Sequence, residues 1–127
     1  MGRRGRVQPA GPLAGPAVGA GPYAPGMATF AVTLVHGPGW DAARPIRRQD
    51  GWDEHAAFMD GLVGDGFLIL GGPLGPGHRT LHLVQAADER EVAARLGGDP
   101  WASAGLLRIG GIDPWALWLD SRPAARG

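Results

Sequence analysis

Two residues of this sequence could together carry out proton-transfer chemistry, His55 and Asp99. A histidine has an ordinary pKa of about 6.5, so His55 could accept a proton near neutral pH as a general base. The carboxylate of Asp99 could accept a hydrogen bond from one imidazole nitrogen, which would fix the tautomer and raise the basicity of the other nitrogen. Each residue also has a structural alternative. His55 could be a core histidine bonded to a backbone carbonyl, and Asp99 could cap the turn that Pro100 begins.

The residues around His55 predict one helix followed by one strand. Between residues 50 and 64, apolar side chains recur at helical spacing, at Phe58, Met59, Leu62 and Val63. His55 precedes them by one turn on the same face, so its ring should point toward the core. Gly64 and Gly66 should end the helix, and the apolar run after them predicts a strand over residues 67–71.

The remaining elements should bring Asp99 close to that helix. Runs rich in β-forming residues predict further strands over residues 29–35, 79–86 and 106–112. Asp88, with Glu91 at its capping-box position, begins a second helix, and Asp99 before Pro100 begins a short extra turn. The order β-α-β-β-α-β predicts an α+β, ferredoxin-like fold, a four-stranded antiparallel sheet with two helices on one face. Since both helices share that face, the segment after the second helix can reach the flank of the first, and Asp99 can meet His55.

The predicted strands also indicate a partner. Three of them are apolar on both faces or nearly so, although a sheet with helices on one side should alternate apolar and polar residues. The simplest cover for the second face is another copy of the chain, sheet against sheet. We therefore expect a homodimer of the dimeric α+β barrel type. The segment Trp115–Leu119 is also strongly apolar, and we expect it to be buried in the core or the dimer interface.

The composition favours one small domain that binds neither nucleic acid nor a membrane. The chain has 127 residues, enough for a modest core, and no cysteine, so disulfides and thiolate sites are excluded. Residues 27–127 contain nine of the twelve arginines, no lysine and all twelve acids, which disfavours nucleic-acid binding. No apolar run reaches the roughly 18 residues of a membrane span. We expect a cytoplasmic protein.

The first 26 residues differ from the rest of the chain. They are mainly Gly, Pro, Ala and Arg, too poor in large apolar residues to build a core. They are either a disordered leader or a gene-start error, with Met27 as the true initiator. We expect the folded domain to cover residues 27–121 and residues 122–127 to form a flexible tail.

Several residues besides the His55–Asp99 pair are candidates for contact with a small organic substrate. The predicted substrate-binding residues are His36, Trp52, Gly72, Pro73 and Trp101. Trp52 and Trp101 flank the pair in sequence and could wall a flat apolar pocket. The glycine-rich stretch 71–77 lacks the lysine and the following helix of a phosphate loop, so it predicts a tight β-turn.

A metal site is a weaker alternative. The candidate ligands are the four histidines, His36, His55, His78 and His82. Histidine sites usually need supporting carboxylates and hydrogen-bonding partners around them, and the sequence has no HExxH motif. We expect neither a metal nor another cofactor.

In this order and spacing, the residues resemble the YCII-related (YciI-like) family of the dimeric α+β barrel superfamily. The resemblance covers about residues 28–119 and depends on these pieces: residues 55–59 (His-Ala-Ala-Phe-Met), Gly66, residues 71–73, Glu91-Val92, residues 99–101 and Pro114-Trp115. It implies a ferredoxin-like fold, a dimer and a pocket where His55 meets Asp99. Better-known members carry an arginine three residues before the histidine, where this chain has Trp52. The contact of such an arginine with an anionic substrate is therefore not implied for this chain.

The family resemblance leaves two functions open. A few relatives are linked to elimination or isomerisation on chlorinated or lactone-type products of aromatic breakdown. This implies a cofactor-independent lyase or isomerase that uses the His55–Asp99 pair. The alternative is a non-catalytic dimeric module that binds a small ligand or a protein. A histidine nitrogen bonded to Asp99 at the floor of an open pocket favours the enzyme, and a histidine enclosed in the core favours the module.

Overall fold

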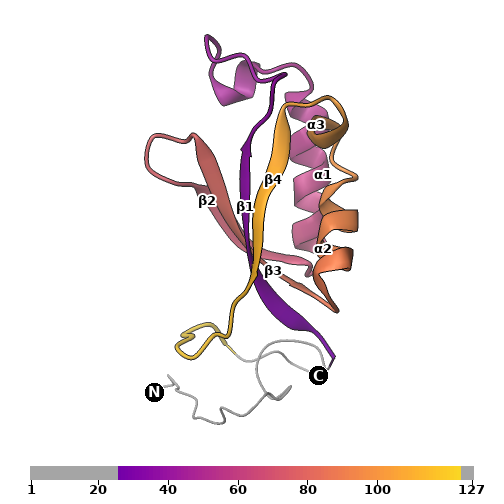
Figure 1. The fold of residues 1–127 in the computed structure, drawn as a ribbon, viewed down its shortest axis with the longest axis vertical. Coiled ribbons are helices and arrows are strands. Elements are labelled where there is room, and N and C mark those ends of the chain that lie inside the picture. Colours follow the sequence, from indigo (N-terminus) through magenta and orange to yellow (C-terminus); the bar gives the residue numbers. More distant parts are fainter. Residues whose placement is uncertain (1–25, 124–127) are drawn as a thin grey trace.

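The computed structural model describes residues 26–123 as an α+β domain, in which the long helices lie on one side of an antiparallel sheet (Figure 1). Apart from Gly26, the predicted leader lies outside the described residues, as do residues 124–127 of the predicted tail. Among the residues described, no helix is both long enough and apolar enough to cross a membrane.

Eight helices and strands follow one another within residues 26–123. They are β1 (Ala28–His36), the 3-10 helix η1 (Ile46–Arg48), α1 (Trp52–Gly64), β2 (Leu68–Pro73), β3 (Arg79–Ala86), α2 (Glu89–Leu96), α3 (Pro100–Ser103) and β4 (Leu107–Pro114). The four strands form one sheet in the order β2-β3-β1-β4, and each neighbouring pair is antiparallel. The predicted four-stranded antiparallel sheet is confirmed. The 3-10 helix was not predicted, because residues 40–50 are polar and lack apolar periodicity.

The predicted end of the last strand was wrong. The strand was predicted to end at residue 112, yet Asp113 and Pro114 also belong to β4, and Pro114 lies opposite Phe30 of β1. The reason is that β4 is an edge strand with a neighbour on one side only. A proline at such an edge removes no hydrogen bond from the sheet when its missing N–H faces away from the neighbouring strand.

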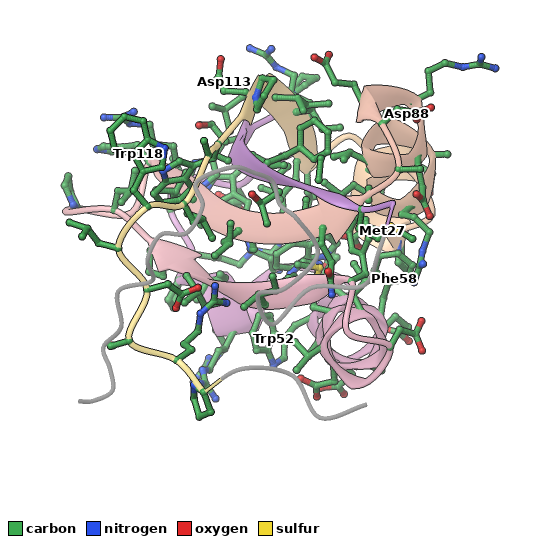
Figure 2. The ribbon with its side chains drawn as sticks, turned by 90° about the horizontal axis from the view of Figure 1, so that it is seen from below. Met27, Trp52, Phe58, Asp88, Asp113 and Trp118 are labelled. Carbon is green, nitrogen blue, oxygen red and sulfur yellow. The ribbon has the colours of Figure 1, made fainter. Side chains whose placement is uncertain are left out.

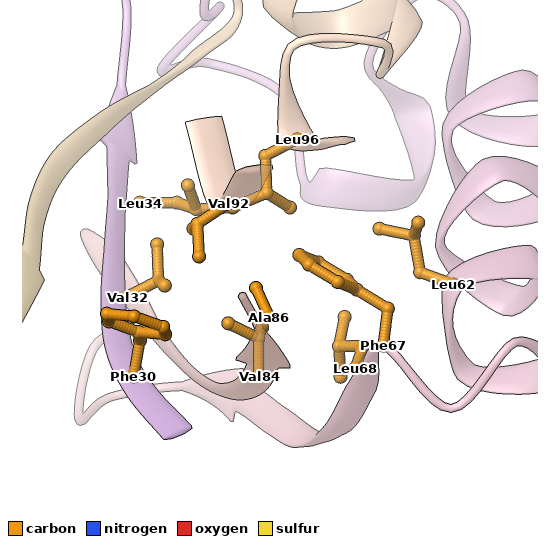
Figure 3. Packing of buried hydrophobic residues seen from close by; sticks show 10 residues of the cluster. All are labelled: Phe30, Val32, Leu34, Leu62, Phe67, Leu68, Val84, Ala86, Val92 and Leu96. Carbon is orange, nitrogen blue, oxygen red and sulfur yellow. The ribbon is translucent and has the colours of Figure 1, made fainter. Parts of the chain in front are cut away.

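The core lies between the sheet and the helices. Alternate residues of β1 are buried on the helix-facing side, Phe30, Val32 and Leu34, and they contact Val92 and Leu96 of α2 and Leu62 of α1 in one apolar cluster (Figure 3). Burying a side chain of this size stabilises a fold by about 1.5–3 kcal/mol. The cluster therefore fixes both helices against the same face.

The other face of the sheet is only partly covered. Leu83 is buried there, whereas Leu70 on the neighbouring strand is 53% exposed. After β4 the chain continues across this side, where the Trp115 N–H donates to the carbonyl of Thr29 at 2.9 Å.

The expectation that Trp115–Leu119 is buried was wrong for the single chain. Trp115 is 40% exposed, Trp118 74% and Leu119 90%. Figure 2 shows Trp118 on the side of the molecule away from the two longer helices. Burial of Trp118 would need a cover that the described residues 26–123 do not supply. An apolar sequence pattern does not reveal whether such a cover exists.

Candidate functional site

A cluster of aromatic rings lies between the start of α1 and the short helix α3. It consists of His36, Trp40, Trp52, His55 and Trp101. Helix α1 starts after Gly51, whose φ of 78° lies in the left-handed region that favours glycine. The carbonyl of the preceding Asp50 accepts a hydrogen bond from Trp101 Nε1 at 2.7 Å. A Cβ added at Gly51 would lie 3.3 Å from that same nitrogen. The first turn of α1 is therefore attached directly to α3.

Asp99 uses its two carboxylate oxygens for two different tasks. Oδ1 accepts a hydrogen bond from the Trp101 backbone N–H at 2.9 Å, which caps α3. Oδ2 lies 2.8 Å from Nδ1 of His55. Both side chains are buried, with residue exposures of 7% for His55 and 4% for Asp99. The structure thus brings the predicted pair together, and the capping role occurs alongside it.

Aromatic rings fix the orientation of the His55 ring. Trp101 stacks on it with a centroid distance of 3.9 Å and an interplanar angle of 7°, and Trp52 lies 5.8 Å away. Trp40 meets Trp101 edge-on at 5.6 Å and stacks on His36 at 3.8 Å. Trp52 and Trp101, predicted to contact a substrate, therefore both lie against the His55 ring.

Among the described residues, the ring contact that joins His36 to this cluster is its stacking on Trp40. The position of Trp40 could not be predicted, because this residue lies in a loop without apolar periodicity. Burial lowers the pKa of His36, and the charge of His78 lowers it further.

A positive charge also lies beside this cluster. The guanidinium carbon of Arg47, from η1, is 5.4 Å from the centre of the Trp52 ring. Such cation–π contacts are worth about 0.5–1 kcal/mol at exposed sites. A guanidinium group thus lies beside Trp52, the residue three positions before His55.

Gly72 and Pro73 do not join the pair. Both line a surface hollow of about 310 Å³ together with Leu70, Leu83 and Trp115, and neither His55 nor Asp99 contributes to it. The tight turn predicted over residues 71–77 is present only in its second part, where the Gly77 N–H donates to the Leu74 carbonyl at 2.9 Å. Residues 71–73 belong instead to β2, so the expectation that this strand ends at Gly71 was wrong. A second hollow of about 280 Å³ also lacks both residues of the pair, and Arg122 and Pro123 of the predicted tail contribute to its lining.

The metal alternative gains no support from the geometry. Within residues 26–123, no three or more His, Asp or Glu side chains form a group that could hold a metal ion. The four histidines considered as ligands are instead divided between the aromatic cluster, the turn before β3 and β3 itself.

His82 is a residue of this region that the sequence suggested only as a metal ligand. It lies on β3 opposite Val32 and Gly71, on the helix-facing side, and is 8% exposed. Burial lowers the pKa of His82, and the charge of His55 lowers it further, so the two rings interact. Nδ1 of His82 and Oγ1 of Thr80 are both buried without a hydrogen-bond partner among the described residues.

The pair can act as a base. A carboxylate bonded to Nδ1 holds the imidazole proton on that nitrogen, which leaves the lone pair of Nε2 free to accept a proton.

Comparisons with family models, with curated proteins and with solved structures find no match to this chain. The arguments for function therefore rest on the site itself.

Proposed function

We propose that this protein is a cofactor-independent enzyme that takes a proton from carbon in a small organic substrate, with His55 as the base and Asp99 as the residue that orients it. One observation carries the proposal, the 2.8 Å contact between His55 Nδ1 and Asp99 Oδ2 in a buried setting. Exclusion of water strengthens an electrostatic interaction of this kind.

The contact supports a lyase or isomerase reaction. His55 Nε2 accepts a proton from carbon, and the imidazolium that forms is stabilised by the Asp99 carboxylate. In an isomerisation the same nitrogen returns the proton to another carbon. In an elimination the electron pair expels a leaving group. Trp101, stacked on the ring at 3.9 Å, keeps the imidazole plane fixed during either reaction.

We further propose that the chain is a YCII-related protein with a ferredoxin-like fold that forms a homodimer in the cytoplasm. The strand order β2-β3-β1-β4 supports the fold, because it follows when two split βαβ units share one sheet. The partly covered sheet face supports the dimer. A second copy placed there would cover Leu70 and the exposed Trp118.

A specific observation favours a second candidate, a non-catalytic dimeric module that binds a small ligand or a protein. His55 is 7% exposed, and neither hollow described above includes it. On this alternative, the pair only joins α3 to α1. The hydrogen bond between the two residues would then contribute to stability and not to turnover.

Exchange of carbon-bound hydrogen distinguishes the two candidates. The protein is incubated in deuterated buffer with small lactones and ketones that have an acidic C–H, and NMR records deuterium incorporation. We expect exchange that His55→Asn abolishes and that the matched variant His78→Asn, at an exposed turn position, retains. Equal exchange by wild type and His55→Asn, or none above buffer, favours the module.

A further inference from the structure

The helix-facing side of β3 changes from apolar to polar along its length. Val84 and Ala86 are fully buried in the apolar core near the end of α1. Thr80 and His82 occupy the preceding positions on the same face, where β1 presents Leu34 and Val32. A core-facing strand would normally continue with apolar residues here. Two polar side chains in their place need a physical reason.

Neither polar side chain is satisfied within the described residues. Thr80 Oγ1 and His82 Nδ1 are buried and have no hydrogen-bond partner. Leaving a buried donor or acceptor unpaired costs free energy, so native proteins nearly always supply a partner from the chain, from water or from a ligand. Gln85 also has an unpartnered oxygen, but it lies on the other face of the sheet, where its Nε2 donates to the Gly66 carbonyl.

The chain also makes room for the His82 ring. Gly71 lies opposite His82 on β2, and a Cβ added there would be 2.4 Å from Cδ2 of that ring. Since real Cβ contacts are never so short, a larger residue at this position would displace the ring. His82 faces the helix side of the sheet, where α1 carries His55, and the charge of His55 contributes to the lowered pKa of His82.

We propose that Thr80 Oγ1 and His82 Nδ1 bind the substrate oxygen that becomes negative when His55 removes a proton, so that the substrate is a carbonyl compound. This inference rests on the proposed function. The C–H bond next to the carbonyl breaks, its proton goes to His55 Nε2, and its electron pair forms the C=C bond of an enolate while the carbonyl electrons move to oxygen. The Thr80 hydroxyl and an N–H at His82 Nδ1 donate to that oxygen. Returning the proton from Nε2 to another carbon completes an isomerisation.

The two groups suit this role because both can donate without being charged. A neutral imidazole with its proton on Nδ1 and a hydroxyl group resemble the donors of an oxyanion hole, where fixed dipoles stabilise charge as it develops. The hydrogen bonds become stronger when the carbonyl turns into an enolate, so they lower the barrier for the reaction and not only the energy of the bound substrate.

Binding of 4-nitrophenolate tests the oxyanion site without a known substrate. The absorbance of this probe separates its anionic from its neutral form, and its oxygen resembles that of an enolate. We expect wild-type protein to bind the anion in preference to the phenol, and Thr80→Val to weaken binding of the anion by about tenfold, as for loss of one hydrogen bond to a charged group. Because valine has the shape of threonine without the unpaired hydroxyl, the melting temperature of this variant should stay equal or rise. The matched control is Thr33→Val, on the other face of β1, which should bind like wild type.

His82→Gln provides a second measurement, and we expect it to weaken binding of the anion by the same factor. If His82→Gln does not fold, Thr80→Val alone decides the test. The inference is overturned if wild type binds no 4-nitrophenolate at millimolar concentration, if Thr80→Val binds it normally, or if Thr80→Val lowers the melting temperature, which would mean that the hydroxyl has a structural partner. A failure of the proposed function would look different from a failure of this oxyanion site. If His55 is not the base, His55→Asn would leave deuterium exchange unchanged, while Thr80→Val would still weaken binding of the anion.

Discussion

Replacing Asp99 by asparagine should separate its two tasks. The Trp101 backbone N–H can only donate, so the asparagine oxygen should remain on it and keep the cap. The asparagine NH₂ group then faces Nδ1 of His55, 2.8 Å from the replaced oxygen. Since two donors cannot face each other, the histidine should move its proton to Nε2, and the nitrogen that would act as base loses its lone pair.

The magnitudes follow from these two bonds. Asp99→Asn should cost about 1 kcal/mol of stability or less, because one charge-assisted hydrogen bond becomes a neutral one. Asp99→Ala removes the cap and leaves a buried N–H unpaired, which should cost about 2–4 kcal/mol. The wrong tautomer in Asp99→Asn should lower any turnover by about 10³–10⁴-fold.

Two assays check the tautomer argument, and neither needs a substrate. Chemical denaturation gives the difference in stability between the two variants. Long-range ¹H–¹⁵N NMR spectra above pH 7 identify which ring nitrogen of His55 carries the proton. We expect the proton on Nδ1 in wild type and on Nε2 in Asp99→Asn. A histidine that keeps its proton on Nδ1 in the variant, or two variants of equal stability, would refute the reasoning.

Two further outcomes are expected. Leu70→Arg should change the stability of the single chain by about 0.5 kcal/mol or less, because the residue is 53% exposed, but should give a monomer in analytical ultracentrifugation if that face is the dimer interface. Val63→Arg, at a 54% exposed position on α1, is the matched control that should remain dimeric. Acid should also destabilise the fold. Burial lowers the pKa of His82, and the charge of His55 lowers it further. As the pH falls below about 6.5, the unfolded chain therefore binds a proton at this residue before the folded chain does. The free energy of unfolding should then fall by at most about 1.4 kcal/mol per pH unit. Denaturation at pH 7 and pH 5 should show a smaller loss in His82→Gln, with the remainder due in part to His36, whose pKa is lowered too.

The elements and the His55–Asp99 contact could be predicted because their signals are local. Helical spacing placed His55 on the inner face of α1, and an aspartate before a proline marked the start of α3. Once both helices are assigned to one face of the sheet, few positions remain for the segment between α2 and β4. The meeting of the two residues then follows from the order of elements.

The errors concern properties that no short segment determines. Trp118 is as apolar as a core residue, yet its exposure depends on what lies opposite it, and within residues 26–123 it is 74% exposed. Gly72 and Pro73 were predicted to contact a substrate, but they line a hollow without the pair. The environment of His82 was missed because it depends on a glycine of the neighbouring strand, which sequence spacing does not reveal.

The direction of the chain explains why the site forms where it does. Strand β1 ends where α1 begins, and α2 runs back toward that same end before α3 and β4 (Figure 1). The first turn of α1 and the segment after α2 therefore meet, although His55 and Asp99 are 44 residues apart. Only residues in that first turn can reach Asp99, and successive helix positions differ by about 100°. Of the residues there, His55 is buried, while Asp53 and Glu54 are exposed. Thr80 and His82 lie on the helix-facing side of β3, opposite Leu34 and Val32 near the end of β1. The base and the two unpaired groups thus lie on the same side of the sheet, toward the end at which α1 begins.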